Sequence, residues 1–357
     1  MQDILTYKNQ RFHSLWLRDN CQCPECRHEN GQRLHETWQL PADVKIAESR
    51  ETDTGLWVRF AEPHAHESEF IDAYLTEHAY DQPAAKPETT SLWGSDLELD
   101  SISFEYADVI SDDRTKLAWL DALISHGITK LSGVPAQAGI ILKAVDLFGF
   151  VRQTNYGTLF EVKTEEKPQN LAYTPMPLSL HTDNPYRDPV PTLQLLHCLV
   201  QAQEGGVTAL TDGFEAARIL REEYPEKFAL LNEQIVRFRF ASEDAELEHQ
   251  DTMITTNTRG EIIKVRINNR SSAPFQVDFD IMPAFYDAYQ TFMRIVQGDR
   301  CKRTLKLQSG DLILFNNERV LHGREVQAIG ARHLQGCYAD IDSLRSTAAV
   351  LRNKLNG

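Results

Sequence analysis

The chain has 357 residues, of which 41% are hydrophobic and 25% charged, a composition typical of a globular protein long enough for about two domains. A formal net charge of -15 argues against binding to the phosphate backbone of nucleic acids, because such proteins usually carry a basic surface. No stretch reaches the roughly 18 to 20 continuous apolar residues that a membrane-spanning helix needs. Residues 1–7 lack the basic and then apolar pattern of a secretory signal, so we expect a cytoplasmic protein.

The first 80 residues favour a small antiparallel β domain, because short runs such as residues 56–60 alternate in hydrophobicity. Here Cys21, Cys23 and Cys26 form a C-x-C-x2-C cluster, which with a fourth ligand can hold zinc tetrahedrally. The alternative is a cluster of reduced, buried thiols. A zinc site with four protein ligands has no open position, so we expect a structural role. The histidines that are candidates for the fourth ligand are His28, His35, His64 and His66.

Residues 81–90 contain two prolines and no periodicity, which predicts a linker. We therefore place an N-terminal zinc-binding domain at residues 1–85 and a second domain at residues 95–357.

The second domain is expected to be mainly β with flanking helices. Helical spacing of apolar residues occurs at residues 114–125, which Gly127 closes as a C-terminal cap, and at residues 212–220, 224–232 and 282–296. Strand-like runs cover residues 192–200, 235–240, 262–267, 311–315 and 333–339. Many strands with a few helices outside them predict a double-stranded β-helix, or jelly roll.

An apolar run at residues 178–181 delivers His181 and then Asp183, just before a turn. If the run is a strand, the two side chains point the same way, because side chains alternate along a strand. With one distant histidine they would form the facial triad of non-haem Fe(II) oxygenases. The alternative is a hydrogen-bonded histidine near the surface. A second His-x-Asp pair, at residues 249–251, follows an acidic run that is typical of a solvated helix or loop.

The distant histidine is expected to be His322. An apolar strand, a polar turn and a return strand over residues 314–324 would bring it into the barrel beside the first pair. Ten residues further on, Arg332 is placed to bind a carboxylate through two parallel hydrogen bonds, which lysine does less well. A His-x-Asp pair, a distant histidine and a following arginine thus occur in the order that a site for iron and 2-oxoglutarate requires.

At this point the chain resembles the γ-butyrobetaine hydroxylase branch of the Fe(II)/2-oxoglutarate dioxygenases, over essentially its whole length. The resemblance lies in residues 16–21 (WLRDNC), 181–183 (HTD), 194–198 (QLLHC), 320–323 (VLHG) and 335–338 (QGCY). It implies iron at His181, Asp183 and His322, and 2-oxoglutarate on Arg332 and Thr208. It implies zinc at Cys21, Cys23, Cys26 and His66. It also implies ascorbate as the reductant and a homodimer.

Members of this branch resemble one another in holding a trimethylammonium group within a cage of aromatic rings, where each good cation–π contact contributes roughly 0.5 to 2 kcal/mol. The small-molecule substrate is therefore expected to carry this group. The alternative for Phe160 is plain core packing. The matching positions here are Tyr156, Phe160, Tyr173 and Tyr338, with Asn170 as a further substrate contact.

The opposite end of the substrate decides between two relatives within this branch. A phosphonate has more charge and more acceptor oxygens than a carboxylate, so it calls for more donors. The chain here resembles the enzymes that hydroxylate 2-(trimethylammonio)ethylphosphonate at the carbon bonded to phosphorus, which gives a 1-hydroxy product. The residues that carry this resemblance are Asn184, Tyr186, Asn269 and Arg270. The alternative function is γ-butyrobetaine hydroxylation to L-carnitine, with Tyr186 and Arg270 as mere surface residues.

Two readings outside enzymology are an inactive barrel that only binds betaines and a zinc-dependent interaction module. The intact His181, Asp183, His322 and Arg332 argue against the first. Nothing basic or repetitive supports the second.

Overall fold

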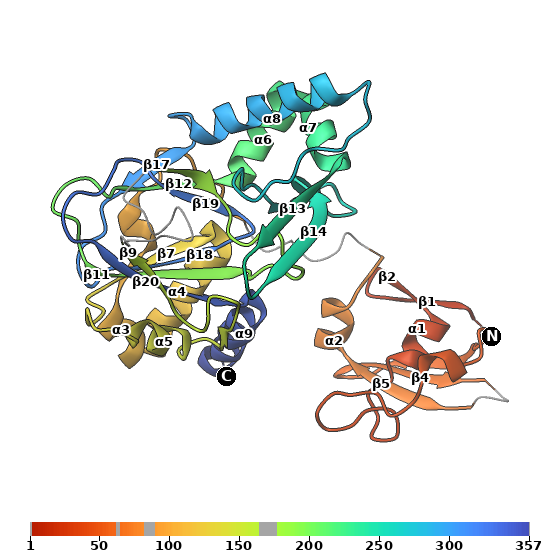
Figure 1. The fold of residues 1–357 in the computed structure, drawn as a ribbon. Helices are drawn as coiled ribbons and strands as arrows, with labels where there is room; N and C mark the ends of the chain where they lie inside the picture. Colours follow the sequence, from red (N-terminus) through yellow and green to blue (C-terminus); the bar gives the residue numbers. More distant parts are fainter. Residues whose placement is uncertain (1, 62–64, 82–89, 164–176, 357) are drawn as a thin grey trace. The chain divides into compact units, whose positions relative to one another are not determined.

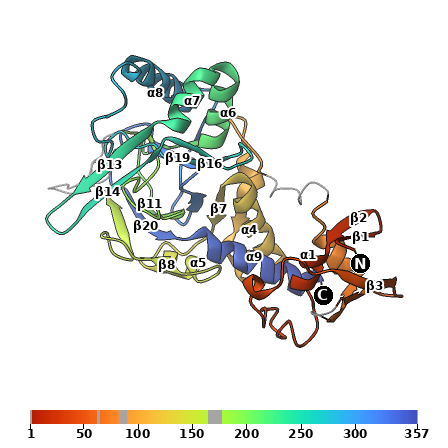
Figure 2. The same cartoon turned by 90° about the vertical axis from the view of Figure 1, so that its right-hand side faces the viewer.

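The protein is described from a computed structural model over residues 2–61, 65–81, 90–163 and 177–356. The chain divides into two compact units, Met1–Pro87 and Glu88–Gly357, shown in Figures 1 and 2. Residues 82–89 of the predicted linker lie outside the described ranges. Within those ranges, none of the helices has the length and apolarity that crossing a bilayer requires.

The first unit is the small antiparallel β domain that the alternating pattern predicts. Its core contains Phe12, Leu17, Val58 and Phe70, which are almost fully buried. In β5, burial alternates residue by residue, as expected for a strand with one face on a core. The elements are a hairpin of β1 (Ile4–Tyr7) and β2 (Gln10–His13), a sheet in the order β3 (Ile46–Glu51), β4 (Gly55–Phe60) and β5 (Glu67–Ile71), and the helices α1 (Ser14–Asp19), η1 (Thr37–Gln39) and α2 (Asp72–Glu77).

The second unit contains two sheets that face each other, which is the predicted jelly roll. Apolar residues of both sheets meet between them, including Leu196 and Ile313 from one sheet and Leu210 and Val320 from the other. The smaller sheet has the order β10 (Leu178–His181), β19 (Val320–Arg324), β12 (Thr208–Asp212) and β17 (Lys302–Leu305). The larger sheet has the order β6 (Ser103–Glu105), β7 (Ile128–Ser132), β18 (Leu312–Asn316), β11 (Leu193–Val200), β20 (His333–Ala339) and β8 (Val151–Arg152), and β9 (Phe160–Lys163) pairs with β20.

Helices cover the outer face of each sheet, and Figure 1 shows the two groups on opposite sides of this unit. The larger sheet is covered by α3 (Tyr106–Ser111), α4 (Asp113–His126), α5 (Ile140–Val145) and α9 (Ile341–Asn356), whereas η2 (Leu99–Ile102) packs on the core between the sheets. The smaller sheet is covered by α6 (Gly213–Glu223), α7 (Pro225–Glu233) and α8 (Met282–Gln297). Two hairpins complete the unit, one of β13 (Ile235–Ala241) and β14 (Glu246–Thr252), the other of β15 (Ile254–Thr256) and β16 (Ile262–Val265).

The predicted helices at residues 114–125, 212–220, 224–232 and 282–296 are confirmed as α4, α6, α7 and α8. The C-terminal cap of α4 is Gly127, with a left-handed φ of 75° and its N–H donated to the carbonyl of Leu123. The acidic run before residue 249 is a loop over residues 242–245, as predicted, but its second half enters strand β14. Its glutamates form ion pairs across the hairpin, Glu246 with Arg239 and Glu248 with Arg237, and opposite charges on paired strands stabilise a sheet.

Candidate active site

Two histidines face each other on neighbouring strands of the smaller sheet. His181 ends β10 and lies opposite His322 of β19 in the antiparallel register. Their ring centroids are 4.4 Å apart. The predicted return strand exists, but it does not form a hairpin with β18, because β18 belongs to the larger sheet and β19 to the smaller one. The crossover between sheets is what carries His322 to His181.

Asp183 does not lie on a strand with His181, as the alternation argument assumed, because β10 ends at His181. Tertiary hydrogen bonds hold it instead. The Asp183 N–H donates to Oδ1 of Asn317 at 2.7 Å, and Nδ2 of Asn317 donates to the Asp183 carbonyl at 2.9 Å. One residue earlier, the Thr182 N–H donates to the carbonyl of Ile267 at 2.7 Å. The loops around Asn317 and Ile267 therefore aim the carboxylate.

The three side chains fit one octahedral metal ion. Nε2 of His181 lies 3.2 Å from Oδ1 of Asp183, and Nε2 of His322 lies 4.0 Å from Oδ2. All three ligand atoms lie within 4.8 Å of one another. Two ligands at right angles, each about 2.1 Å from an ion, are about 3 Å apart. The ring of His181 is also oriented for ligation, because Nδ1 donates to the carbonyl of Ser179 at 2.8 Å and so turns Nε2 toward Asp183.

The surroundings keep these groups in the protonation states that bind a metal. Burial alone would raise the pKa of Asp183, but the hydrogen bond with His181 and the nearby positive charges outweigh it and hold that pKa well below its usual range. Burial, together with repulsion from His181, lowers the pKa of His322 to about 3. The carboxylate is therefore ionised and the imidazole neutral at pH 7.

A cavity of about 370 Å³ opens on the triad. Arg332 and Thr208, the residues expected to hold 2-oxoglutarate, line it together with the buried Arg324. Burial and the charge of Arg332 lower the pKa of Arg324 to about 10, so the two guanidinium groups lie near each other. Asp183 is the one carboxylate among the described lining residues, so this end of the cavity favours an anion.

Aromatic rings line another part of the same cavity. The expected cage residues Tyr156, Phe160 and Tyr338 are all present, and the rings of Phe160 and Tyr338 lie 5.1 Å apart. Phe160 also packs on the core between the sheets, as the alternative reading predicts. Gly336 lies opposite Phe160 in the strand pairing, and a Cβ there would come within 2.2 Å of the Phe160 ring. The Phe160 ring can therefore lie across β20 only because residue 336 is a glycine.

Tyr186 is buried, with 5% of its surface exposed, so the surface reading of this residue is wrong. Its ring stacks on Phe240 at 5.1 Å, and its hydroxyl donates to Oδ1 of Asn184 at 2.9 Å. Since that hydroxyl has one proton, the 3.0 Å contact with Tyr156 has the Tyr156 hydroxyl as donor. Because Oδ1 of Asn184 faces the Tyr186 hydroxyl, the Nδ2 donor of the same amide points away from Tyr186.

The four residues expected to contact the anion do not all reach the cavity. Asn184, Tyr186 and Arg270 line it, and Arg270 is at the same time exposed to solvent, as its surface reading predicts. Asn269, which is also exposed, does not line the cavity and accepts a hydrogen bond from Tyr289 at 3.3 Å. The preceding residue, Asn268, is the asparagine of the cavity wall. Nδ2 of Asn268 donates to the Thr182 carbonyl at 3.0 Å, which fixes it beside the triad. Two further expected substrate contacts, Asn170 and Tyr173, lie outside the described residues.

The second His-x-Asp pair has a structural contact instead. His249 lies 4.0 Å from the nearest carboxylate oxygens of Asp188 and Asp251. Asp251 pairs with the buried Arg266 at 3.1 Å, and Arg266 donates to the backbone carbonyls of Pro185 and Arg187. This pair therefore supports the turn that follows Asp183.

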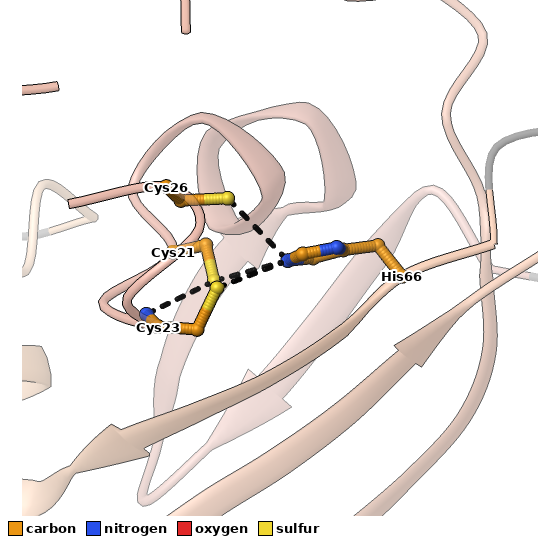
Figure 3. A group of neighbouring side chains, drawn as sticks. All are labelled: Cys21, Cys23, Cys26 and His66. Carbon is orange, nitrogen blue, oxygen red and sulfur yellow. Dashed lines mark hydrogen bonds between the residues drawn. The ribbon is translucent and has the colours of Figure 1, made fainter. Parts of the chain in front are cut away.

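Figure 3 shows that the cysteine cluster of the first unit converges on His66. The sulfur atoms of Cys21, Cys23 and Cys26 lie 3.2, 3.6 and 3.5 Å from its Nε2 atom. Tetrahedral ligands about 2.2 Å from one ion are about 3.6 Å apart, so the four atoms fit zinc. Of the other expected fourth ligands, His35 bonds Asp19 at 3.2 Å, and His64 lies outside the described residues.

We expect one zinc ion per chain, and we expect the variant Cys23→Ala to lose it. Because a structural zinc ion contributes directly to folding, zinc loss should lower the unfolding temperature of the first unit and leave iron binding in the second intact. Elemental analysis and differential scanning calorimetry measure both. The matched control is Cys301→Ala, a buried cysteine of the second unit, which should keep its zinc. Retained zinc in Cys23→Ala would contradict the assignment.

Sequence reasoning missed several cavity residues. For Arg324 a signal was available, since it follows His322 by two positions on one strand and so shares its face. For Phe240 and Arg239, which line the cavity from β13, the sequence offers no comparable signal. These two residues reach the site only through the placement of the β13–β14 hairpin.

A jelly roll that brings two histidines and a carboxylate to one cavity, with an arginine beyond them, defines a non-haem iron dioxygenase that uses 2-oxoglutarate. The profile of the family described as "Taurine catabolism dioxygenase TauD, TfdA family" matches residues 85–338. The profile described as "Gamma-butyrobetaine hydroxylase-like, N-terminal" matches residues 5–70. The chain therefore belongs to the TauD, TfdA family, in its γ-butyrobetaine hydroxylase-like branch.

Individual relatives agree with this placement. The chain is 37% identical to gamma-butyrobetaine dioxygenase of Pseudomonas sp. (strain AK-1), over 96% of this chain and 90% of that protein. It is 30% identical to the human gamma-butyrobetaine dioxygenase, over 99% of this chain and 95% of the relative. Among solved structures, a taurine dioxygenase from Burkholderia xenovorans superimposes with a TM-score of 0.51 at 14% identity, over 67% of this chain and 87% of its own. That last likeness concerns the fold alone.

Proposed function

We propose that this enzyme hydroxylates 2-(trimethylammonio)ethylphosphonate at the carbon bonded to phosphorus, which gives a 1-hydroxy product. The observation that carries the proposal is Arg270, a guanidinium in the wall of the cavity that contains the triad. The proposal has three parts: the metal and cosubstrate, the ammonium end of the substrate and its anionic end.

His181, Asp183 and His322 would hold Fe(II), and Arg332 with Thr208 would hold the distal carboxylate of 2-oxoglutarate. When bound, these cofactors would activate dioxygen: one of its oxygen atoms enters the C–OH group that replaces a C–H bond, and the other enters the succinate that forms, with carbon dioxide, from 2-oxoglutarate. The task of the protein is to place one C–H bond next to the metal. From the family resemblance we also infer ascorbate as the reductant, a homodimer and a cytoplasmic location.

The aromatic residues are suited to the ammonium end. Tyr156, Phe160 and Tyr338 face the cavity, and Tyr186 and Phe240 add two more rings. A quaternary ammonium group cannot donate a hydrogen bond, so ring faces are its natural partners. The names of the relatives support this choice, because γ-butyrobetaine and trimethyllysine both carry a trimethylammonium group.

Charge supports the phosphonate at the other end. Among the described residues that line the cavity, four are arginines, at positions 239, 270, 324 and 332, and one is a carboxylate, that of Asp183. Glu246 neutralises Arg239 at 2.6 Å, and Arg324 lies beside Arg332 at the expected cosubstrate site. Arg270 lies near the metal ligands, since its charge lowers the pKa of both Asp183 and His322. An anion on Arg270 would lie close to the metal, and the carbon next to that anion would be the one oxidised.

The alternative is γ-butyrobetaine hydroxylation at C3 to give carnitine. The relatives favour it, because the 37% identical protein from Pseudomonas sp. (strain AK-1) bears the name gamma-butyrobetaine dioxygenase. In that substrate the reacting carbon lies one bond further from the anion, which fits an anion site more distant from the metal than Arg270.

The test compares kcat/KM for the two substrates in the wild type and in Arg270→Ala. A charge-assisted hydrogen bond contributes about 1.5 to 3 kcal/mol, so we expect the variant to lose about 10- to 100-fold for the phosphonate. The loss for γ-butyrobetaine should be smaller, because its carboxylate has less charge. Product formed per unit time is measured by mass spectrometry.

The matched variant is Arg239→Ala, which removes a second arginine of the cavity wall, but one already paired with Glu246. Its loss with the phosphonate should be well below that of Arg270→Ala. Higher kcat/KM for γ-butyrobetaine in the wild type would favour the alternative function. Unchanged phosphonate turnover in Arg270→Ala would remove the basis of the proposal.

A further inference from the structure

The hydroxyl group of Tyr338 makes a contact that a ring of an ammonium cage does not need. It donates to Oδ2 of Asp183 at 2.9 Å. Tyr338 is 4% exposed and lies on β20 of the larger sheet, opposite Gln194 of β11 on one side and Arg152 of β8 on the other. The metal-binding carboxylate and this hydroxyl therefore come from different parts of the chain and meet inside the cavity.

The ring of Tyr338 has little freedom to turn its hydroxyl elsewhere. One face lies against Phe160, with ring centroids 5.1 Å apart and planes tilted by 31°. Phe160 itself is fixed across β20 by Gly336. An ionised carboxylate can only accept a hydrogen bond, so the hydroxyl of Tyr338 is the donor.

The contact separates the two oxygens of the carboxylate. Oδ2 accepts from Tyr338, whereas Oδ1 lies 3.2 Å from Nε2 of His181, close to the distance of about 3 Å for neighbouring ligands of one octahedral ion. The backbone of Asp183 is held separately by Asn317. Asn317 thus fixes where the residue lies, and Tyr338 fixes how its carboxylate is turned.

We infer that Tyr338 is a positioning residue for the metal as well as a wall of the substrate cavity: its hydroxyl holds Oδ2 of Asp183 so that the carboxylate ligates iron through Oδ1 alone. A carboxylate that offers both oxygens takes one of the positions that a facial triad otherwise leaves open for the cosubstrate and dioxygen. The inference rests on the iron site of the proposed function and is independent of which trimethylammonium substrate the enzyme accepts.

The test is Tyr338→Phe, which keeps the ring and removes the hydroxyl. Loss of a hydrogen bond to a metal ligand typically weakens metal binding about 10- to 100-fold, and we expect a change of that size in the Kd for Fe(II). The Kd is obtained by anaerobic titration of Fe(II) in the presence of 2-oxoglutarate, followed by the charge-transfer absorption of the complex. In air, succinate should exceed hydroxylated product in the variant, whereas the wild type should form the two in equal amounts.

The control is Tyr156→Phe, which removes a hydroxyl from the same cavity that bonds Tyr186 and not Asp183. Its Kd for Fe(II) should stay within about twofold of the wild type. An unchanged Kd in Tyr338→Phe, with succinate and product still equal, would reduce Tyr338 to a ring of the cage and overturn the inference. If no trimethylammonium compound were turned over, the anaerobic titration would still decide the role of Tyr338.

Discussion

Replacing His181 by alanine is expected to abolish hydroxylation, whereas the same change at His249 is expected to leave it nearly intact. Both residues begin a His-x-Asp sequence, but only His181 meets a third ligand, His322. Removing one ligand of a facial triad forfeits most of the several kcal/mol that a bound metal contributes, which corresponds to a loss of at least about 10³-fold in kcat. Succinate formation stimulated by substrate measures the activity, and anaerobic Fe(II) titration measures the metal.

His249→Ala is a matched control because its ring lies 4.0 Å from the carboxylates around it and none of those contacts is short. Its partner Asp251 should be left in place, since Asp251 holds Arg266, and Arg266 holds the turn after Asp183. If His249→Ala lost Fe(II) and His181→Ala retained it, the assignment of the metal site would be wrong.

The comparison of these two pairs shows what the sequence could predict. The order of residues along the chain, with His322 and Arg332 downstream of the first pair, predicted the three side chains that the structure brings together at the candidate metal site. Periodicity also located α4, α6, α7 and α8, because each has an apolar face at helical spacing and packs on a sheet. Local patterns are sufficient where one face of an element is buried and the other is not.

The same reasoning failed where contacts between distant segments decide the outcome. The backbone of Asp183 is held by Asn317, which is 134 residues away, and not by a place on the strand of His181. Asn268 lines the cavity and Asn269 faces out, a difference of one residue that depends on how Nδ2 of Asn268 bonds Thr182. Strand β14 forms in an acidic run because arginines of β13 pair with its glutamates. No single segment contains this information.

The position of His322 depends on a buried ion pair that lies outside the cavity. Arg319 precedes β19, and its guanidinium donates to Asp212 at 3.0 and 2.7 Å, at the end of the neighbouring strand β12. Both side chains are almost fully buried, with 3% and 0% exposed. Arg319 also donates to the carbonyls of Ser125 and Ser91. Arg319 thus joins the start of β19 to β12, and His322 lies opposite Leu210 within that pairing.

We expect Arg319→Met to lower the free energy of unfolding by about 3 to 5 kcal/mol, because it leaves the carboxylate of Asp212 buried without its partner. The matched control is Arg218→Met on α6, which also loses two carboxylate contacts, with Glu215 and Glu222, but at a partly exposed position where such pairs contribute less than about 1 kcal/mol. Urea denaturation followed by tryptophan fluorescence compares the two variants. Equal losses of stability in both variants would mean that the buried pair does not anchor β19. A loss confined to Arg319→Met, together with weaker Fe(II) binding at urea concentrations below the unfolding transition, would link this pair to the position of His322.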